Sequence, residues 1–254
     1  MRVRAVYRLS GGTTASERSM HDWQHRRALG GCAVLVAAAW SALALIHYSP
    51  YARYFTHEVL GESAFSPPAA VALFTGGWLI MIVAMMVPGV MPVLAHSLRR
   101  GAVGHWATWL AGNVSPWLLL GFAFAAADLV IHSQVAPRYP LLAARLPSLL
   151  WLAAGAHLVL VSAAPNRVDA PRTRAGMTTH RSAFLRGWRT GLADLGAGWL
   201  MMLAVAGSHG HLAVMAAVTV LMSAPSYWPV PRWSIVAAGA SLALLGARLL
   251  LAVL

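Results

Sequence analysis

The sequence predicts an all-α fold, a polytopic transmembrane helical bundle with about seven spans. Of its 254 residues, 59% are hydrophobic and only 10% are charged, whereas a soluble domain usually carries about 25% charged residues. The few charges gather in clusters, and the apolar runs between them reach the roughly 20 residues that a helix needs to cross a bilayer. No connection between these runs has the length of a soluble domain, so we expect one helical membrane domain.

Seven apolar runs define the expected spans. The first follows an arginine-rich cytoplasmic tail, residues 1–29, and lacks a small-residue cleavage site, so we expect it to be retained rather than removed as a signal peptide. The sixth is the weakest, because prolines crowd its end. The transmembrane domain covers residues 30–254 and includes an arginine-rich cytoplasmic loop at 165–189. The expected spans are residues 30–48, 68–95, 105–131, 147–164, 190–206, 211–228 and 234–254.

The arginines predict the orientation. All 19 basic residues are arginine, and with the N-terminus inside, 15 lie on the cytoplasmic side and 4 outside. Because positive residues accumulate in cytoplasmic segments, we expect a cytoplasmic N-terminus. The exclusive use of arginine, together with abundant alanine, is typical of a GC-rich bacterium and places the chain in a bacterial inner membrane. The net charge of +12 then indicates anionic lipid head groups as partners, not nucleic acid.

Glycines recur where spans should touch. Gly239 and Gly246 lie seven residues apart in the last span, and Gly191, Gly196 and Gly198 line the fifth. Small residues allow helix backbones to approach closely in lipid. We therefore expect helix contacts at these positions.

The second span carries the densest chemical signal, a run of methionines interrupted by prolines. Soft thioethers select Cu(I), but methionine also fills gaps in apolar interiors, and the spacing leaves both interpretations open. Pro88 removes the backbone hydrogen bond to Ala84 and kinks the helix, so the freed carbonyl needs a partner inside the bundle. Five residues recur at intervals of three or four and share one helix face: Trp78, Met81, Met85, Pro88 and Pro92.

Two motifs carry a family resemblance. The run from Trp78 through Met81, Met85 and Met86 to the prolines has the pattern W-x-x-M-x-x-A-M-M-x-P-x-x-x-P. Residues 184–202 are similar to a G-x-x-x-G followed by C-x-G-C-C-W-x-L-M. Together they resemble a bacterial family of predicted metal-binding integral membrane proteins. The resemblance implies a copper-like metal held by the thioethers of the second span, with Met201 and Met202 of the fifth as helpers.

The resemblance also implies packing roles for Trp78 and Trp199, and it has one clear departure. The cysteines of the family correspond here to Asp194, Ala197 and Gly198. Since thiolates are the strong soft ligands, the resemblance implies either a divergent member whose metal site is lost or rebuilt, or a methionine motif that binds no metal. Its single cysteine, Cys32, excludes an intrachain disulfide and a thiolate cluster.

Asp194 is a candidate functional charge, because an ionisable group inside a membrane segment indicates function by default. The sequence places it in the first turn or two of the fifth span. The alternative is an interfacial carboxylate neutralised by Arg186 or Arg189 and favoured by the positive end of the helix.

A second candidate metal site lies at the outer ends of the spans. Asp128 and His132 are four residues apart, so one helical face can present both to a cation. His209 and His211 flank the tight turn before the sixth span, and two imidazoles at this spacing can chelate Cu(II), Zn or Ni. These ligands suit entry of a metal or its exchange with a periplasmic carrier, although polar loops of unrelated purpose have the same composition.

No enzymatic motif is present. The sequence contains no Walker A motif, no G-x-G-x-x-G, no G-x-S-x-G and no H-E-x-x-H, so we do not expect an enzyme. The expected function is transition-metal handling, with copper as the best chemical match. The alternatives are a structural or partner-binding subunit of a membrane complex, or a small transporter whose kink at Pro88 moves.

Overall fold

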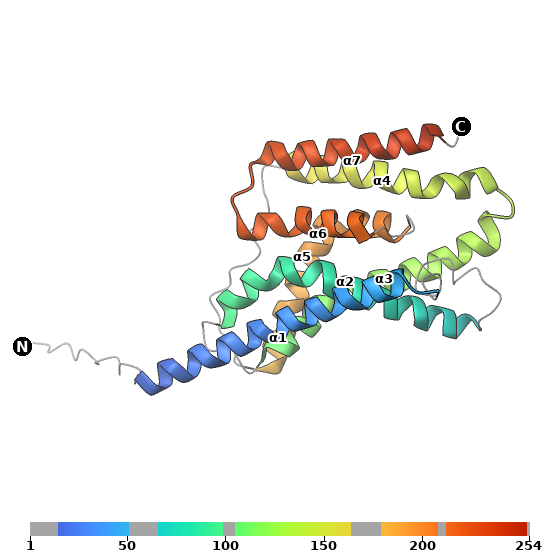
Figure 1. Ribbon diagram of the computed structural model, residues 1–254. Helices are drawn as coiled ribbons and strands as arrows, with labels where there is room; N and C mark the ends of the chain where they lie inside the picture. Colours follow the sequence, from blue (N-terminus) through green and yellow to red (C-terminus); the bar gives the residue numbers. More distant parts are fainter. Residues whose placement is uncertain (1–14, 51–65, 99–104, 164–178, 208–211, 253–254) are drawn as a thin grey trace, which may run out of the picture.

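All the regular structure in the described residues, which are 15–50, 66–98, 105–163, 179–207 and 212–252, is helical (Figure 1). This computed structural model therefore confirms the all-α class and the seven long helices. In chain order they are α1 (Ala15–His47), α2 (Pro67–Leu98), α3 (Trp106–Val130) with a π-helical turn η4 (Ile131–Val135), α4 (Pro140–Ala163), α5 (His180–Ala206), α6 (Leu212–Tyr227) and α7 (Arg232–Ala252).

Five of these helices are long and apolar enough to cross a membrane: α1, α2, α3 with η4, α4 and α7. Helix α6 has 16 residues, which gives about 24 Å at 1.5 Å per residue, less than the roughly 30 Å of a hydrocarbon core. Helix α5 carries three arginines in its first ten residues. Length and composition thus support five of the seven expected spans in the described part of the chain.

Three helices begin earlier than the apolar runs predicted. Helix α1 starts at Ala15, inside the expected tail, and α4 starts at Pro140 rather than near residue 147. Helix α5 starts at His180, so residues 180–189 are helical and do not belong to the expected loop. Hydropathy marks the segment that lipid covers, whereas the backbone hydrogen bonds of a helix continue through flanking polar turns.

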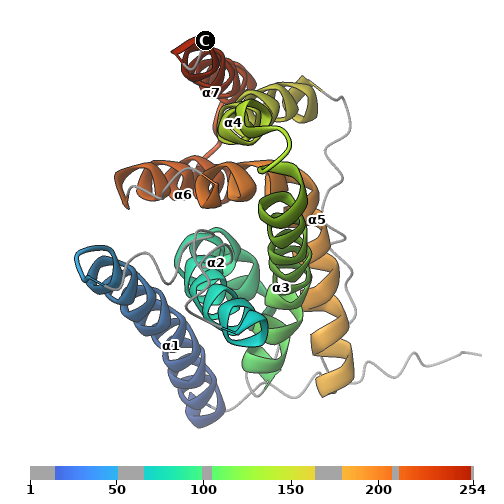
Figure 2. The ribbon, with the colours of Figure 1, turned by 90° about the vertical axis from the view of Figure 1, so that its right-hand side faces the viewer.

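The helices include two close pairs, which contact each other through α4 and α5. Helix α3 lies along α5, and α4 lies along α7 (Figure 2). Helix α1 packs on α2, and α6 runs between α2 and the α4–α7 pair (Figures 1 and 2). Helix α2 therefore contacts α1, α3 and α6, which encloses the methionine run.

Glycines form the contacts within both close pairs. A Cβ atom added at Gly187 of α5 would overlap the carbonyl oxygen of Trp109 in α3. At the other pair, a Cβ atom at Gly239 of α7 would lie 2.9 Å from the carbonyl oxygen of Gly155 in α4. Three further glycines leave no room for a side chain at these two interfaces: Gly112, Gly191 and Gly246. The expected close contacts at Gly191, Gly239 and Gly246 are confirmed.

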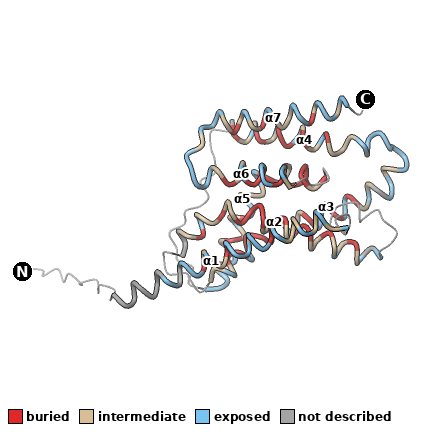
Figure 3. Tube along the Cα trace, in the orientation of Figure 1, coloured by how far each residue is buried: buried red, intermediate tan, exposed pale blue. Residues whose placement is uncertain are grey.

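The buried residues face the space between helices, whereas α7 and the outer sides of α3 and α4 are largely exposed (Figure 3). Many of the exposed side chains are apolar, for example Leu119, Phe122 and Leu160. The outer surface is therefore as apolar as the interior in the middle of these helices.

Candidate metal centre

The methionines of α2 lie inside the bundle. Met85 is fully buried, and Met81 and Met86 are 7% and 6% exposed. The helix stays α-helical through both prolines, so the methionine run and the proline run form one continuous element. The three thioethers are thus presented to neighbouring helices and not to the surface.

Both backbone carbonyls that the prolines release have found donors. Pro88 cannot donate to the carbonyl of Ala84, and the indole Nε1–H of Trp40 in α1 donates to that oxygen at 3.1 Å. Pro92 likewise leaves the carbonyl of Pro88 without its helical donor, and the hydroxyl of Tyr227 in α6 donates to it at 2.7 Å. The expectation that the freed carbonyl at Ala84 has a partner in the bundle is confirmed, and α1 and α6 are fixed to α2 at its weakest point.

Trp78 fixes α2 to α3. Its indole Nε1–H donates to the carbonyl oxygen of Trp117 at 2.8 Å, and its ring packs against Phe74 and Phe124 with centroids 5.9 and 6.0 Å away. A Cβ atom at Gly121 would overlap the Trp78 ring, so the indole fits only because residue 121 has no side chain. Trp78 thus positions the helix turn that carries Met81.

All five predicted methionine ligands belong to one continuous buried cluster. Met201 and Met202 of α5 are 4% and 0% exposed. Helices α2 and α5 are not close neighbours in the described structure, since each instead packs on α3 and α6. Helix α6 adds two thioethers to the cluster, the buried Met215 and the half-buried Met222.

Met222 lies at the junction of α3, α5 and α6. A Cβ atom added at Gly198 would overlap the Met222 methyl group and would lie 3.7 Å from its sulfur. The same position is 3.5 Å from the ring of Trp117. A thioether from α6 therefore fills the space beside Gly198.

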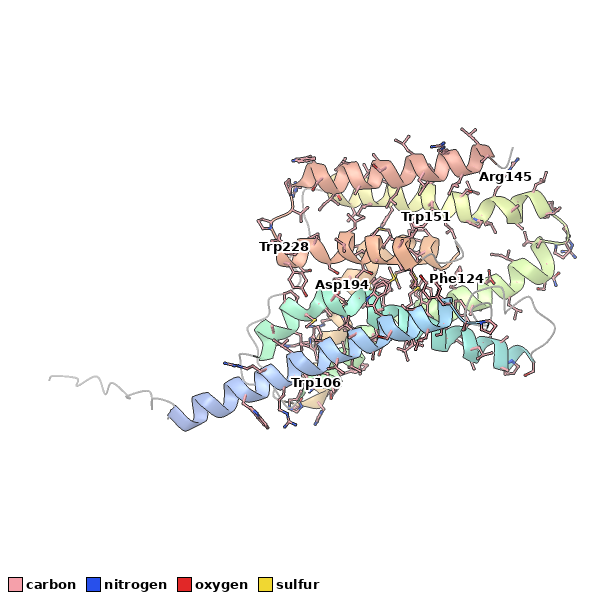
Figure 4. All side chains as sticks on the ribbon, viewed as in Figure 1. Trp106, Phe124, Arg145, Trp151, Asp194 and Trp228 are labelled. Atoms are coloured by element: carbon pink, nitrogen blue, oxygen red, sulfur yellow. The ribbon has the colours of Figure 1, made fainter. Side chains whose placement is uncertain are left out.

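One helical turn away, α3 and α5 bring two polar side chains together. The carboxyl group of Asp194 faces the amide group of Asn113, which is 1% exposed. Neither amide atom of Asn113 nor Oδ2 of Asp194 makes a hydrogen bond of regular geometry, and the indole N–H of Trp117 is also unpaired. Figure 4 shows Asp194 in the interior, between the ends marked by Trp228 and Arg145. Buried polar side chains are usually hydrogen-bonded, so this Asn113–Asp194 pair is an unusual polar feature of the α3–α5 interface.

Residues 75–249 match the model of the PpoB2 family, which is described as a copper chaperone. The chain belongs to the PpoB2 copper chaperone family. No curated protein and no solved structure matches it. The match includes the methionine run of α2 and the motif of α5, which are the two stretches that carried the resemblance. Membership indicates copper handling, and it agrees with the expectation of a metal-related family.

The remaining residues of the two sequence motifs separate into two groups. Gly191 and Gly198 face neighbouring helices, as described above. Gly196 and Trp199 do not: a Cβ atom at Gly196 would meet nothing within 4 Å, and Trp199 is 36% exposed. His157 of α4 covers this side of α5, with Nε2 3.0 Å from the carbonyl oxygen of Gly196 and its ring 6.2 Å from that of Trp199. We expected a neighbouring helix to pack against the Cα of Gly196, and this expectation is wrong.

Asp194 lies deeper than expected. Because α5 begins at His180, Asp194 is about 21 Å along the helix from its start, not within the first turn or two. Its neighbour is Asn113, which the sequence did not indicate. Arg186 is half-buried and Arg189 is exposed, so the interfacial alternative stays open.

The expected outer site falls mostly beyond the described residues. His209 and His211 lie outside them, and the side chain of His132 is not described. Asp128 is in α3 and 6% exposed. Within the described ranges, no group of three or more His, Cys, Asp and Glu side chains is placed to hold a metal ion.

Sequence reasoning missed Asn113, Trp117 and Met222. Each lies on a face that only the pairing of α3 with α5 and the placement of α6 define. A signal was present for Asn113, since a lone amide in an apolar span indicates an interhelical partner.

Proposed function

We propose that the chain is an integral protein of the bacterial inner membrane that binds Cu(I) through methionine thioethers and transfers it, without catalysing a reaction. The single observation that carries the proposal is the burial of the whole methionine motif in a member of a copper chaperone family. Neutral thioethers match the softness of Cu(I). Met81, Met85 and Met86 are the proposed ligands of α2, and Met201 and Met202 approach the same cluster from α5.

The proposed site substitutes for the thiolates that the family motif carries in α5. Gly198 stands at one of those cysteine positions, and the Met222 sulfur lies close to the point where a side chain at 198 would begin. A thioether is thereby available where the thiol is missing. A neutral thioether binds the metal more weakly than a charged thiolate does. The lower affinity suits transfer of the metal more than its storage.

The apolar outer surface supports membrane insertion, and the polar ends support the orientation. Trp23 and Trp233 are exposed near the ends of α1 and α7 that carry Arg27 and Arg232. Tyr48 and Tyr139 are exposed at the opposite helix ends. Such aromatic belts mark the two membrane–water interfaces. We therefore propose a cytoplasmic N-terminus, with membrane lipids and a periplasmic metal carrier as partners.

The test is an anaerobic Cu(I) titration of the purified full chain in detergent. The triple variant Met81→Leu, Met85→Leu, Met86→Leu keeps the core volume, and each such swap usually costs less than about 1.5 kcal/mol of stability. We expect the variant to fold and to lose Cu(I) affinity. Met91→Leu, on the same helix but outside the motif, is the matched control and should bind as the wild type does. Equal binding by all three proteins would remove the proposal.

A partner-binding subunit is the alternative. It predicts that neither the wild type nor the triple variant binds Cu(I) in stoichiometric amount, and that a defined second protein co-purifies with both.

A further inference from the structure

Two histidines from different helices meet at the end of the bundle where α3 and α5 begin. The Nδ1 atoms of His105 and His180 lie 3.3 Å apart. Their rings stand nearly perpendicular, with an interplanar angle of 84° and centroids 4.3 Å apart. The residues are 75 positions apart in the sequence, so only the packing of α3 on α5 brings them together.

The local structure holds this pair in place. His105 is the residue that precedes α3, and His180 is the first residue of α5. The start of α5 is fixed by a capping box, in which Thr179 and Ser182 each bond the backbone N–H of the other. Two turns further along, Gly187 locks α5 against the backbone of α3. The separation of the two rings is therefore set by rigid elements.

A hydrogen bond between the two histidines does not fully account for their arrangement. The hydroxyl Oγ1 of Thr108 lies 2.9 Å from Nδ1 of His180, so two polar atoms converge on the same ring nitrogen. A single Nδ1 has one proton or one lone pair, and it cannot satisfy both neighbours in full. The Nδ1 of His105 is left with a partner that is already engaged by Thr108.

The distance fits a metal ion. A metal bonded to imidazole nitrogens at about 2.0–2.1 Å would see two nitrogens 3.3 Å apart at an angle of about 105–110°, close to the tetrahedral value. His180 is exposed and His105 is half-buried, so an ion can reach the pair from solvent. We propose that His105 and His180 form a two-histidine site for a divalent transition-metal ion.

The site is open and suited to exchange. The described residues offer it no third His, Cys, Asp or Glu ligand, so two positions remain for water or for the ligands of a carrier. The exposed Arg181 follows His180 directly, and its charge opposes a bound cation. The pair lies at the end of the bundle opposite His47, and this divalent-metal site does not depend on the proposed Cu(I) function.

Co(II) is the probe, because imidazoles bind it and thioethers do not favour it. We expect the full chain in detergent to bind Co(II) with the visible absorption of tetrahedral Co(II), and Zn(II) to displace it. His105→Gln and His180→Gln should abolish this signal, because glutamine can still hydrogen bond with Thr108 but is no comparable metal ligand. His47→Ala is the matched control and should leave the signal unchanged.

Two results would overturn the proposal: no tetrahedral Co(II) signal in the wild type, or an undiminished signal in both glutamine variants. Circular dichroism of each variant verifies that the helices are retained. The Cu(I) titration of the methionine variants is independent of these measurements, so a failure here and a failure of the proposed function are distinguishable.

Discussion

Tyr227→Phe should destabilise the protein only while Pro92 is present. The Tyr227 hydroxyl donates at 2.7 Å to the carbonyl of Pro88, which lacks a helical donor because residue 92 has no N–H. Replacing Pro92 with alanine restores that N–H inside a segment that is already helical. The carbonyl then has a backbone donor, and the hydroxyl becomes redundant.

The expected magnitude follows from the geometry. Side-chain hydrogen bonds between membrane helices contribute about 0.6 kcal/mol on average and up to about 1.7. Tyr227 is 48% exposed, so water can partly replace its hydroxyl, and we expect Tyr227→Phe to lower the free energy of unfolding by about 1 kcal/mol. In the Pro92→Ala background the same substitution should have an effect near zero.

The assay is a double-mutant cycle on reversible unfolding in mixed micelles, with tryptophan fluorescence as the signal. Trp40 and Pro88 provide a second cycle of the same design, because the Trp40 indole donates to the Ala84 carbonyl at 3.1 Å. The reasoning is refuted if Tyr227→Phe costs the same with and without Pro92, since the hydroxyl would then not be compensating for the proline.

Two further predictions concern packing. Gly187→Ala should lower the free energy of unfolding by about 1–3 kcal/mol, the usual effect of overpacking, because its Cβ would overlap the carbonyl oxygen of Trp109. Gly196→Ala, on the same helix but with open space around it, should be neutral or stabilising by up to about 1 kcal/mol. Thermal unfolding in detergent compares the two variants. Cys32 is fully buried, so a thiol reagent should label the native protein far more slowly than the unfolded one, and rapid native labelling would contradict the packing of α1.

The sequence predicted those features that depend on a single helix. Seven apolar runs correspond to seven helices, and the spacing of Met81, Met85 and Pro88 predicts a shared face on which both methionines prove to be buried and Pro88 half-buried. It also predicted that a proline in α2 requires a donor from elsewhere, because that need follows from the missing N–H alone. The donors themselves, Trp40 and Tyr227, could not be predicted, since they depend on which helices pack beside α2.

The failures have the same origin. Helix starts were misplaced because an apolar run reports the lipid-covered part of a helix and not its hydrogen-bonded length, and the cap at Thr179 carries no hydropathy signal. Asp194 was placed in the first turn or two of its helix because the start of that helix was placed ten residues too late. The pairing of His105 with His180 could not be predicted, since nothing in the sequence connects positions 75 residues apart.

The contacts between helices differ in rigidity, and this difference affects how an ion could move through the bundle. The α3–α5 and α4–α7 pairs are joined backbone to backbone through glycine, where a shift of even a fraction of an ångström creates overlap. The seam around α6 is different: Met215 and Met222 line it with flexible, polarisable side chains that can repack at small cost. An ion entering the cluster would therefore be accommodated by methionine rotamers around α6, while the glycine-joined pairs hold the frame. Under the proposed Cu(I) function, substituting Met222 should lower the Cu(I) affinity more than it lowers the stability.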